Sequence, residues 1–190
     1  MTLRRSLIAM CGLLLVVGLA ACGHQSPHQS FADANNDGDY VSAGHITYQL
    51  QISRELNQYG TEDSSYIKGL PAGVSPNVGP TQLWYGVFLW AKNQSGHAAT
   101  TSDNFEVVDT QGNVYRPVKL NTAANPFAWT AQNLANLGTE PGPNTVANAG
   151  PTQAGLLLFK VSTSVYSNRP LTLYILGPGN RRLGGISLNL

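Results

Sequence analysis

The feature that most constrains the fold is a run at residues 83–91 whose apolar side chains occupy both alternating positions. One set consists of Trp84, Phe88 and Trp90, and the other of Leu83, Tyr85, Val87 and Leu89. Because successive side chains of a β-strand point to opposite faces, this run predicts a central strand that is buried on both sides. We therefore expect Trp84 and Trp90 to be core residues.

Six further segments carry the pattern of β-strands, and none has the periodicity of an amphipathic helix. Residues 46–52 alternate between apolar and polar side chains, and the other segments are 104–108, 113–118, 156–161, 171–176 and 183–190. A glycine-containing turn at 109–112 predicts a hairpin between two of them. Strands separated by Gly, Pro and Asn, without helical crossovers, predict an all-β fold. We expect an antiparallel immunoglobulin-like β-sandwich of about seven strands over residues 45–190.

The N-terminus has the pattern of an export signal, because Arg4 and Arg5 precede an apolar run at residues 7–17. The sequence Leu19-Ala20-Ala21-Cys22 resembles the lipobox of bacterial lipoproteins, in which the cysteine sulfur is acylated and the preceding residues are removed. The resemblance implies a signal peptide at 1–21, a lipid on Cys22 and a location on the extracytoplasmic face of the cell membrane. An uncleaved membrane span is the alternative, although the run is short for the about 20 residues that a span needs. The arginine pair leaves open whether export follows the general or the twin-arginine pathway.

Residues 22–44 are rich in Ser, Asn, Asp, Gln and His and lack apolar periodicity, which is typical of a disordered tether. This segment contains the first half of a calcium-binding loop, with oxygen-bearing side chains at alternate positions and a glycine at the sixth. The side chains are those of Asp33, Asn35, Asp37 and Asp39, and the glycine is Gly38. The position of the bidentate glutamate that would complete the loop is occupied by Gly44. We therefore favour a solvated acidic linker over a calcium site.

Four segments occur in an order that is known from one family. They are Gly86-Val87-Phe88-Leu89-Trp90-Ala91-Lys92-Asn93, Asp103-Asn104-Phe105-Glu106-Val107-Val108-Asp109, Gly112-Asn113-Val114-Tyr115 and Gly155-Leu156-Leu157-Leu158-Phe159-Lys160-Val161. Together they resemble the telokin-like immunoglobulin-sandwich domain of Gram-positive, actinobacterial-type lipoproteins of unknown function, over residues 45–176. The resemblance implies the sandwich fold and the envelope location. It implies no catalytic residue, and the segments 60–80 and 121–151 depart from the usual form.

Composition restricts the function further. The chain has 11 basic and 10 acidic side chains and no run of more than two basic residues, so it lacks the positive surface that nucleic acid requires. Removal of residues 1–21 would leave Cys22 as the single cysteine, which excludes a disulfide within the chain. No nucleophile elbow, metalloprotease helix, phosphate-binding loop or Cys-x-x-Cys motif occurs. We expect a protein without a cofactor and without enzymatic activity.

The segment 121–151 contains four prolines and is too long for an ordinary connection, which predicts either a functional loop or an irregular edge strand. Phe127 and Trp129 are its candidate binding surface, because aromatic side chains on a loop supply contact area for a partner. We expect a binding module that is attached to the membrane through its lipid and that has an envelope protein as its partner. Two alternatives stay open: a lipoprotein that binds a small molecule or calcium and, less favoured, an envelope hydrolase with a carboxylate pair.

Overall fold

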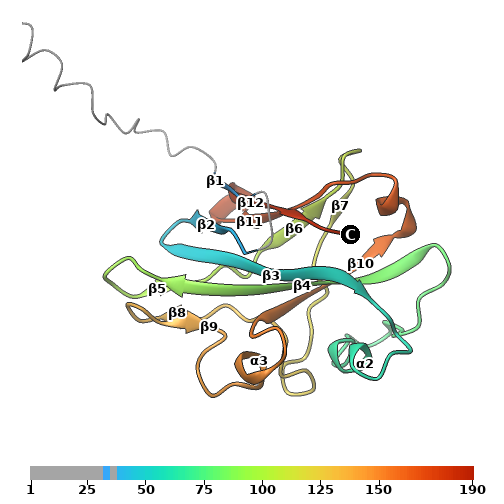
Figure 1. Ribbon diagram of the computed structural model, residues 1–190, viewed down its shortest axis with the longest axis horizontal. Helices are drawn as coiled ribbons and strands as arrows, with labels where there is room; N and C mark the ends of the chain where they lie inside the picture. Colours follow the sequence, from blue (N-terminus) through green and yellow to red (C-terminus); the bar gives the residue numbers. More distant parts are fainter. Residues whose placement is uncertain (1–31, 35–37) are drawn as a thin grey trace, which may run out of the picture. The chain divides into compact units, whose positions relative to one another are not determined.

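The computed structural model describes residues 32–34 and 38–190, which form mainly β-strands (Figure 1). The strands are β1 (Ala32–Ala34), β2 (Tyr40–Ala43), β3 (Ile46–Leu56), β4 (Gln82–Asn93), β5 (Ala99–Thr100), β6 (Phe105–Val108), β7 (Val114–Tyr115), β8 (Asn133–Leu134), β9 (Thr139–Glu140), β10 (Gly155–Ser162), β11 (Leu171–Leu176) and β12 (Arg182–Leu188). The helices are α2 (Asp63–Tyr66), α3 (Val146–Ala149), η1 (Thr163–Tyr166) and η2 (Pro178–Asn180). Within the described ranges, β1 and β12 are the one parallel pair of strands. The predicted all-β, antiparallel fold is confirmed.

The described residues form twelve strands, so the expectation of about seven is wrong. All seven predicted strands are present, as β3, β4, β6, β7, β10, β11 and β12. The predicted hairpin joins β6 to β7, with Val107 opposite Tyr115. The additional strands β1, β2, β5, β8 and β9 are only two to four residues long, which is too short to show a periodicity in the sequence.

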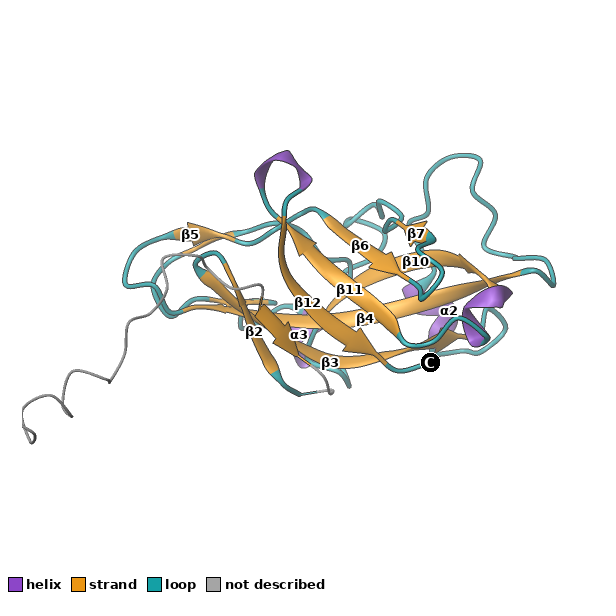
Figure 2. Cartoon of the chain, turned by 90° about the horizontal axis from the view of Figure 1, so that it is seen from above, coloured by secondary structure: helices purple, strands orange, loops and turns teal. Residues whose placement is uncertain are grey.

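Two sheets pack face to face. One has the strand order β1-β12-β11-β6-β7, and the other has the order β10-β4-β3-β2, with β9 also paired to β4. Figure 1 shows β6, β11 and β12 in a layer above β3 and β4, and Figure 2 shows the same layers from above. The larger core includes Leu50, Val87, Leu89, Phe105, Leu173 and Ile186, which come from both sheets. The protein is therefore a β-sandwich.

Strand β4 is buried on both faces, as its sequence predicts. One face contributes to the larger core, whereas Trp84 and Phe88 belong to a second cluster on the outer face of the sheet. Trp90 is only partly buried and belongs to neither cluster, so the prediction that it is a core residue is wrong. The apolar cluster on the outer face includes Trp84 and Phe88 but not Trp90.

Two segments of mostly irregular structure, residues 60–80 and 121–151, cover this outer face. Their helices α2 and α3 lie on the same side in Figure 1. The segment 60–80 contributes Tyr66, Ile67 and Leu70 to the second cluster, the segment 121–151 contributes Phe127, and Val118 and Leu120 come from the residues just before the latter segment. The buried side chain of Asn125 joins the two segments, because its Nδ2 donates to the carbonyl oxygens of Tyr66 and Lys68 at 2.9 and 3.0 Å. The segments 60–80 and 121–151 therefore form a third layer on the sandwich.

A β-bulge directs the apolar residues of β3 to both faces of its sheet. Leu50 is paired with Leu89 and Ile52 with Phe88, so Gln51 is the extra residue between adjacent partners. Leu50 consequently packs in the larger core, whereas Ile52 packs against the second cluster. The strict alternation at residues 46–52 predicts that all the apolar side chains lie on one face. This prediction is wrong, because the bulge places Ile52 on the opposite face from Leu50.

Strands β1 and β2 lie in the segment that was predicted to be a tether. Asp33 of β1 is opposite Gly185 of β12, and Val41 of β2 is opposite Tyr48 of β3. The sandwich therefore begins before His45. Short polar strands can add to the edge of a sheet because the neighbouring strand supplies the backbone hydrogen-bond partners. The predicted signal peptide and Cys22 lie outside the described residues.

In the part of the chain that the structure describes, no helix has the length and apolar character needed to cross a membrane.

Candidate functional site

The candidate site lies where residues 116–130 double back along β10, the edge strand of the second sheet. The backbone N–H of Val118 donates to the carbonyl oxygen of Leu158 at 2.7 Å. The N–H of Trp129 donates to the carbonyl oxygen of Leu156 at 2.9 Å. Strand β10 therefore holds both arms of this segment, and residues from both arms line a hollow beside it.

Trp129 is fixed at the wall of this hollow by contacts with the core. Its ring centroid lies 5.8 Å from that of Phe105 and 6.2 Å from that of Tyr48. Its Nε1 donates to the carbonyl oxygen of Ser102 at 2.9 Å, and the N–H of Ser102 donates to the Tyr48 hydroxyl at 2.7 Å. Burial raises the pKa of Tyr48 to about 12, so this hydroxyl keeps its proton. The indole is therefore held by packing and by a hydrogen bond.

A pocket of about 590 Å³ opens beside Trp129. Its apolar lining includes Phe105, Val118, Leu120, Trp129, Leu156 and Leu157. Its polar lining includes Asp103, Arg116, Lys119, Thr122 and Thr130. A volume in this range, with a mostly apolar floor and a few polar groups, is typical of a site for a small molecule.

Two basic side chains, Arg116 and Lys119, border this first pocket. Nη2 of Arg116 lies 3.4 Å from Oε2 of Glu106, whose Oε1 is 2.8 Å from Nη2 of Arg182. Lys119 makes no ion pair with any residue that the structure describes. Among the charged residues that line the first pocket, two are basic, Arg116 and Lys119, and one is acidic, Asp103. This end of the site favours an anionic group on a ligand.

A second pocket of about 370 Å³ adjoins the first, because Thr122, Ala128 and Thr130 line both. The second pocket is also lined by Gln132, Thr139, Glu140 and Thr145. We refer to the two pockets together as the groove. Basic side chains stand at one end of the groove and the carboxyl group of Glu140 at the other.

Glu140 is buried, with an exposed fraction of 8%, and lies opposite Ala91 of β4. Its carboxyl group makes no hydrogen bond or ion pair with another described residue. It is also the one charged side chain among the described residues that line the second pocket. Burial disfavours the charged form and raises the pKa of Glu140 to about 7. Such a group changes its charge near neutral pH, which is a property of many functional carboxyl groups.

Sequence reasoning missed Glu140, although the sequence contained a signal. Glu140 is the only charged residue between Lys119 and Lys160. A single acid in so long an uncharged stretch has few local partners, so its environment depends on what the fold places around it. Nothing in the sequence indicated that Arg116 and Lys119 would line a pocket that adjoins the pocket of Glu140.

The structure separates the two predicted binding aromatics. Trp129 lines the first pocket, whereas Phe127 lines neither pocket and packs on Tyr66 with 4.9 Å between ring centroids. Both side chains are partly buried against the core clusters instead of forming an exposed loop surface. Trp129 therefore belongs to the candidate site and Phe127 to the covering layer.

The four residues of the predicted calcium loop are divided. Asn35 and Asp37 lie outside the described residues, Asp33 is in β1, and Asp39 is exposed just before β2. Among the residues that are described, no three or more His, Cys, Asp or Glu side chains form a group that could hold a metal ion.

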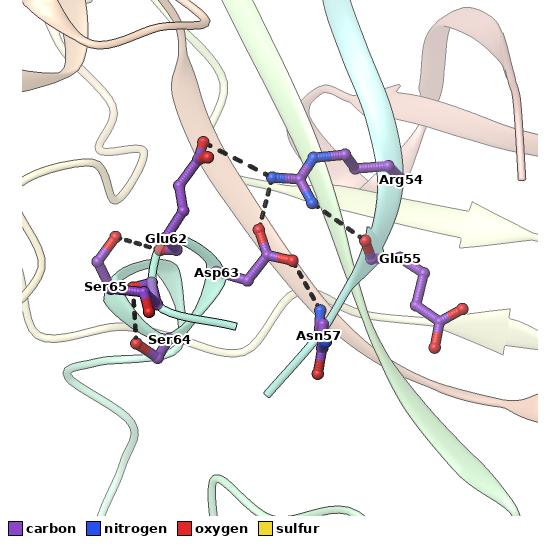
Figure 3. Close-up of polar contacts among 8 residues, drawn as sticks. Arg54, Glu55, Asn57, Glu62, Asp63, Ser64 and Ser65 are labelled. Carbon is purple, nitrogen blue, oxygen red and sulfur yellow. Dashed lines mark hydrogen bonds and ion pairs between the residues drawn. The ribbon is translucent and has the colours of Figure 1, made fainter. Parts of the chain in front are cut away.

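A cluster of charges lies at the start of the covering layer (Figure 3). Nη2 of Arg54 donates to Oδ1 of Asp63 at 2.6 Å, and Oδ2 of Asp63 accepts from the N–H of Asn57 at 2.8 Å. The hydrogen bond from Arg54 lowers the pKa of Asp63, and the same bond raises the pKa of Arg54. Because these groups satisfy one another, the cluster attaches α2 to β3 and offers no free site.

The structure also brings together two histidines that are far apart in the sequence, His45 and His97. The rings of His45 and His97 meet edge to face, with centroids 4.9 Å apart, and both residues are exposed. Two imidazoles without a third ligand among the described residues make a weak metal site.

The fold and the groove define the class of this protein: an all-β sandwich with a site of small-molecule size along one sheet edge. No protein-family model matches the sequence, and no curated protein matches it. Among solved structures, the yjhA protein from Bacillus subtilis is similar over 82% of this chain and 99% of its own, with a TM-score of 0.52 and 12% identity. An uncharacterised β-sandwich protein from Clostridium difficile 630 matches 88% of this chain and 100% of its own, with a TM-score of 0.43 and 10% identity. At 12% identity, the likeness to the Bacillus protein concerns the fold alone.

Proposed function

We propose that this protein is a lipid-anchored lipoprotein of the bacterial cell envelope that binds a small ligand in the groove and does not catalyse a reaction. The observation that carries the proposal is the first pocket, in which an apolar floor with two aromatic rings meets a few polar and basic groups. A small ligand is favoured over a protein partner because Trp129 is built into the wall of a concavity. Binding is favoured over hydrolysis because paired-carboxylate chemistry needs two acids, and Glu140 stands alone among the described residues of its pocket.

The lipobox at Cys22 supports the anchored location on the extracytoplasmic face. The resemblance to the telokin-like immunoglobulin-sandwich lipoproteins supports the same location, and the β-sandwich is compatible with that family. Only residues 23–31 separate Cys22 from β1. Nine residues span at most about 30 Å when fully extended, so a lipid on Cys22 would hold the sandwich close to the membrane surface.

Ligand binding can be tested with 8-anilinonaphthalene-1-sulfonate, an aromatic anion whose emission increases in apolar surroundings. We expect saturable binding, and we expect Lys119→Glu to weaken it at least fivefold because the substitution reverses a charge beside the pocket. Lys68→Glu is the control, since Lys68 is exposed and lies outside the groove. Absence of saturable binding, or equal weakening by both variants, would contradict the proposal.

The anchor can be tested independently with Cys22→Ser. Two acyl chains at about 0.8 kcal/mol per buried methylene bind a membrane stably, so the variant should leave the membrane fraction or retain its signal peptide. Mass spectrometry of the wild-type protein should show a lipid on Cys22 as residue one. An unmodified Cys22 or a retained Met1 would contradict the anchored location.

A further inference from the structure

Three acidic residues are buried in the described part of the chain: Glu106, Asp109 and Glu140. Glu106 accepts hydrogen bonds from Nε and Nη2 of Arg182 at 3.0 and 2.8 Å. Asp109 accepts from the side-chain amide of Asn113 at 2.8 Å, among other donors. Glu140 has no such partner within the described residues. A buried carboxylate normally has a cation or several donors, so Glu140 lacks a group that the other two possess.

The carboxyl oxygens of Glu140 are open to the second pocket. Within the described residues, no fully enclosed side-chain oxygen lacks a hydrogen-bond partner. Because the oxygens of Glu140 have no partner there, they are not fully enclosed, and the space beside this residue is the second pocket. The missing partner can therefore be supplied from that pocket.

The surroundings of Glu140 contain no competing charge. The stretch between Lys119 and Lys160, which supplies the lining of the second pocket, carries no other charged residue. The charged residue of β4 nearest in register is Lys92, which pairs with Thr139. Neighbouring positions on a strand point to opposite faces, so Lys92 lies on the other face from Glu140. A cation that enters the pocket therefore meets one negative group and no positive group.

We propose that the second pocket binds a small organic ammonium ion whose nitrogen pairs with the carboxylate of Glu140. An ammonium group has three N–H donors, and Gln132 and Thr145, whose side chains carry acceptor oxygens, line the same pocket. A divalent metal ion fits less well, because it requires more oxygen ligands than one carboxylate and a few hydroxyl groups supply. The apolar part of the ligand extends past Ala128, which lines both pockets, towards Trp129. This inference names the ligand class of the groove and rests on the proposed function.

Phenethylamine is a suitable probe, with 2-phenylethanol as its uncharged match. Calorimetric titration of the mature protein at pH 7 should show one saturable site for phenethylamine and at least tenfold weaker binding of the alcohol. Glu140→Gln should weaken phenethylamine binding at least tenfold, because it removes the charge and keeps the shape. Glu62→Gln is the matched control, since its carboxylate is largely exposed and lies outside the groove.

Proton release gives a second readout. The free carboxyl group of Glu140 has a pKa of about 7, and pairing with an ammonium ion favours its charged form. Binding at pH 7 should therefore release a fraction of a proton, which titrations in two buffers of different ionisation enthalpy detect. The release should be absent in Glu140→Gln.

The inference is overturned if phenethylamine shows no saturable binding, if 2-phenylethanol binds equally well, or if Glu140→Gln binds like the wild type. In each of these cases the anionic naphthalene probe separates the two proposals. If that probe still binds in a manner that depends on Lys119, the groove is a ligand site of another class. If neither probe binds, the proposed function fails as well.

Discussion

The indole ring of Trp129 lies directly over Gly155, so that a Cβ at residue 155 would come within 2.8 Å of Cε3 of the indole. Gly155 is the first residue of β10, and it lines the second pocket while Trp129 lines the first. The absence of a side chain at residue 155 therefore allows Trp129 to pack between the core and the groove.

Gly155→Ala should displace Trp129 and destabilise the fold by about 1–3 kcal/mol, the usual cost of overpacking. Denaturant unfolding measures the stability, and binding of the naphthalene probe reports the change in the first pocket. Gly79→Ala is the control, because a Cβ at residue 79 meets no atom within 4 Å. Equal effects of the two substitutions would show that the contact with Trp129 is unimportant.

The tryptophans of β4 should respond differently to truncation. Trp84 is fully buried, and its Nε1 donates to the carbonyl oxygen of Pro76 at 2.7 Å, so Trp84→Ala should cost about 3–5 kcal/mol. Trp90 is partly buried and outside both clusters, so Trp90→Ala should cost less than about 1.5 kcal/mol. Urea unfolding of both variants checks the order. The reverse order would mean that the covering layer extends over Trp90.

Glu140 should make the free energy of unfolding depend on pH between about 4.5 and 7. Its carboxyl group has an ordinary pKa of 4.5 in the unfolded chain and about 7 in the fold. Between these values the folded state binds more protons than the unfolded state, so stability falls as the pH rises from about 4.5 to about 7. Glu140→Gln should therefore be more stable than the wild type by about 1–2 kcal/mol at pH 8, a figure reduced for screening by water in the pocket.

At about pH 3, below both pKa values, the same two proteins should be equally stable, because the glutamic acid is then neutral in both states. Thermal unfolding across this pH range measures the difference. A difference that does not change with pH would contradict the raised pKa.

Asp63 should have the opposite pH dependence. The hydrogen bond from Arg54 lowers the pKa of Asp63 below its ordinary value of 3.8. Its contribution to stability is complete above pH 3.8 and is lost as the pH falls through the lower value in the fold. Asp63→Asn should therefore cost about 1 kcal/mol at pH 7, since the pair is partly exposed, and the cost should shrink in acid.

Glu62→Gln serves as the comparison for Asp63→Asn. Oε1 of Glu62 lies 4.0 Å from Nη2 of Arg54, and its side chain is 65% exposed. Little change in the free energy of unfolding is expected for this variant at any pH. If Glu62→Gln lowered the free energy of unfolding as much as Asp63→Asn, long-range charge and not the short hydrogen bond would hold α2 against β3.

The sequence alone determined the β-sandwich class and seven of the twelve strands in the described residues. A continuous apolar run, as in β4 and β10, or an alternation of apolar and polar side chains, as in the first half of β3, is a local property, so it is visible wherever a strand has enough residues. The turn between β6 and β7 was predictable for the same reason, because its geometry depends on a glycine within the turn itself. The five strands that were not predicted carry too few residues for this signal, whereas β7, which is also only two residues long, lies within the longer β-prone run 113–118.

Only the tertiary structure decided which faces are covered and which charged groups are buried. The bulge at Gln51, the incomplete burial of Trp90 and the packing of Trp129 depend on residues that are far away in the sequence. The raised pKa of Glu140 has the same origin, because it is caused by burial where segments distant in the sequence meet. The apolar pattern of a strand depends only on residues that are close in the sequence. Burial depends on contacts that exist only after the sheets and the covering layer have packed together.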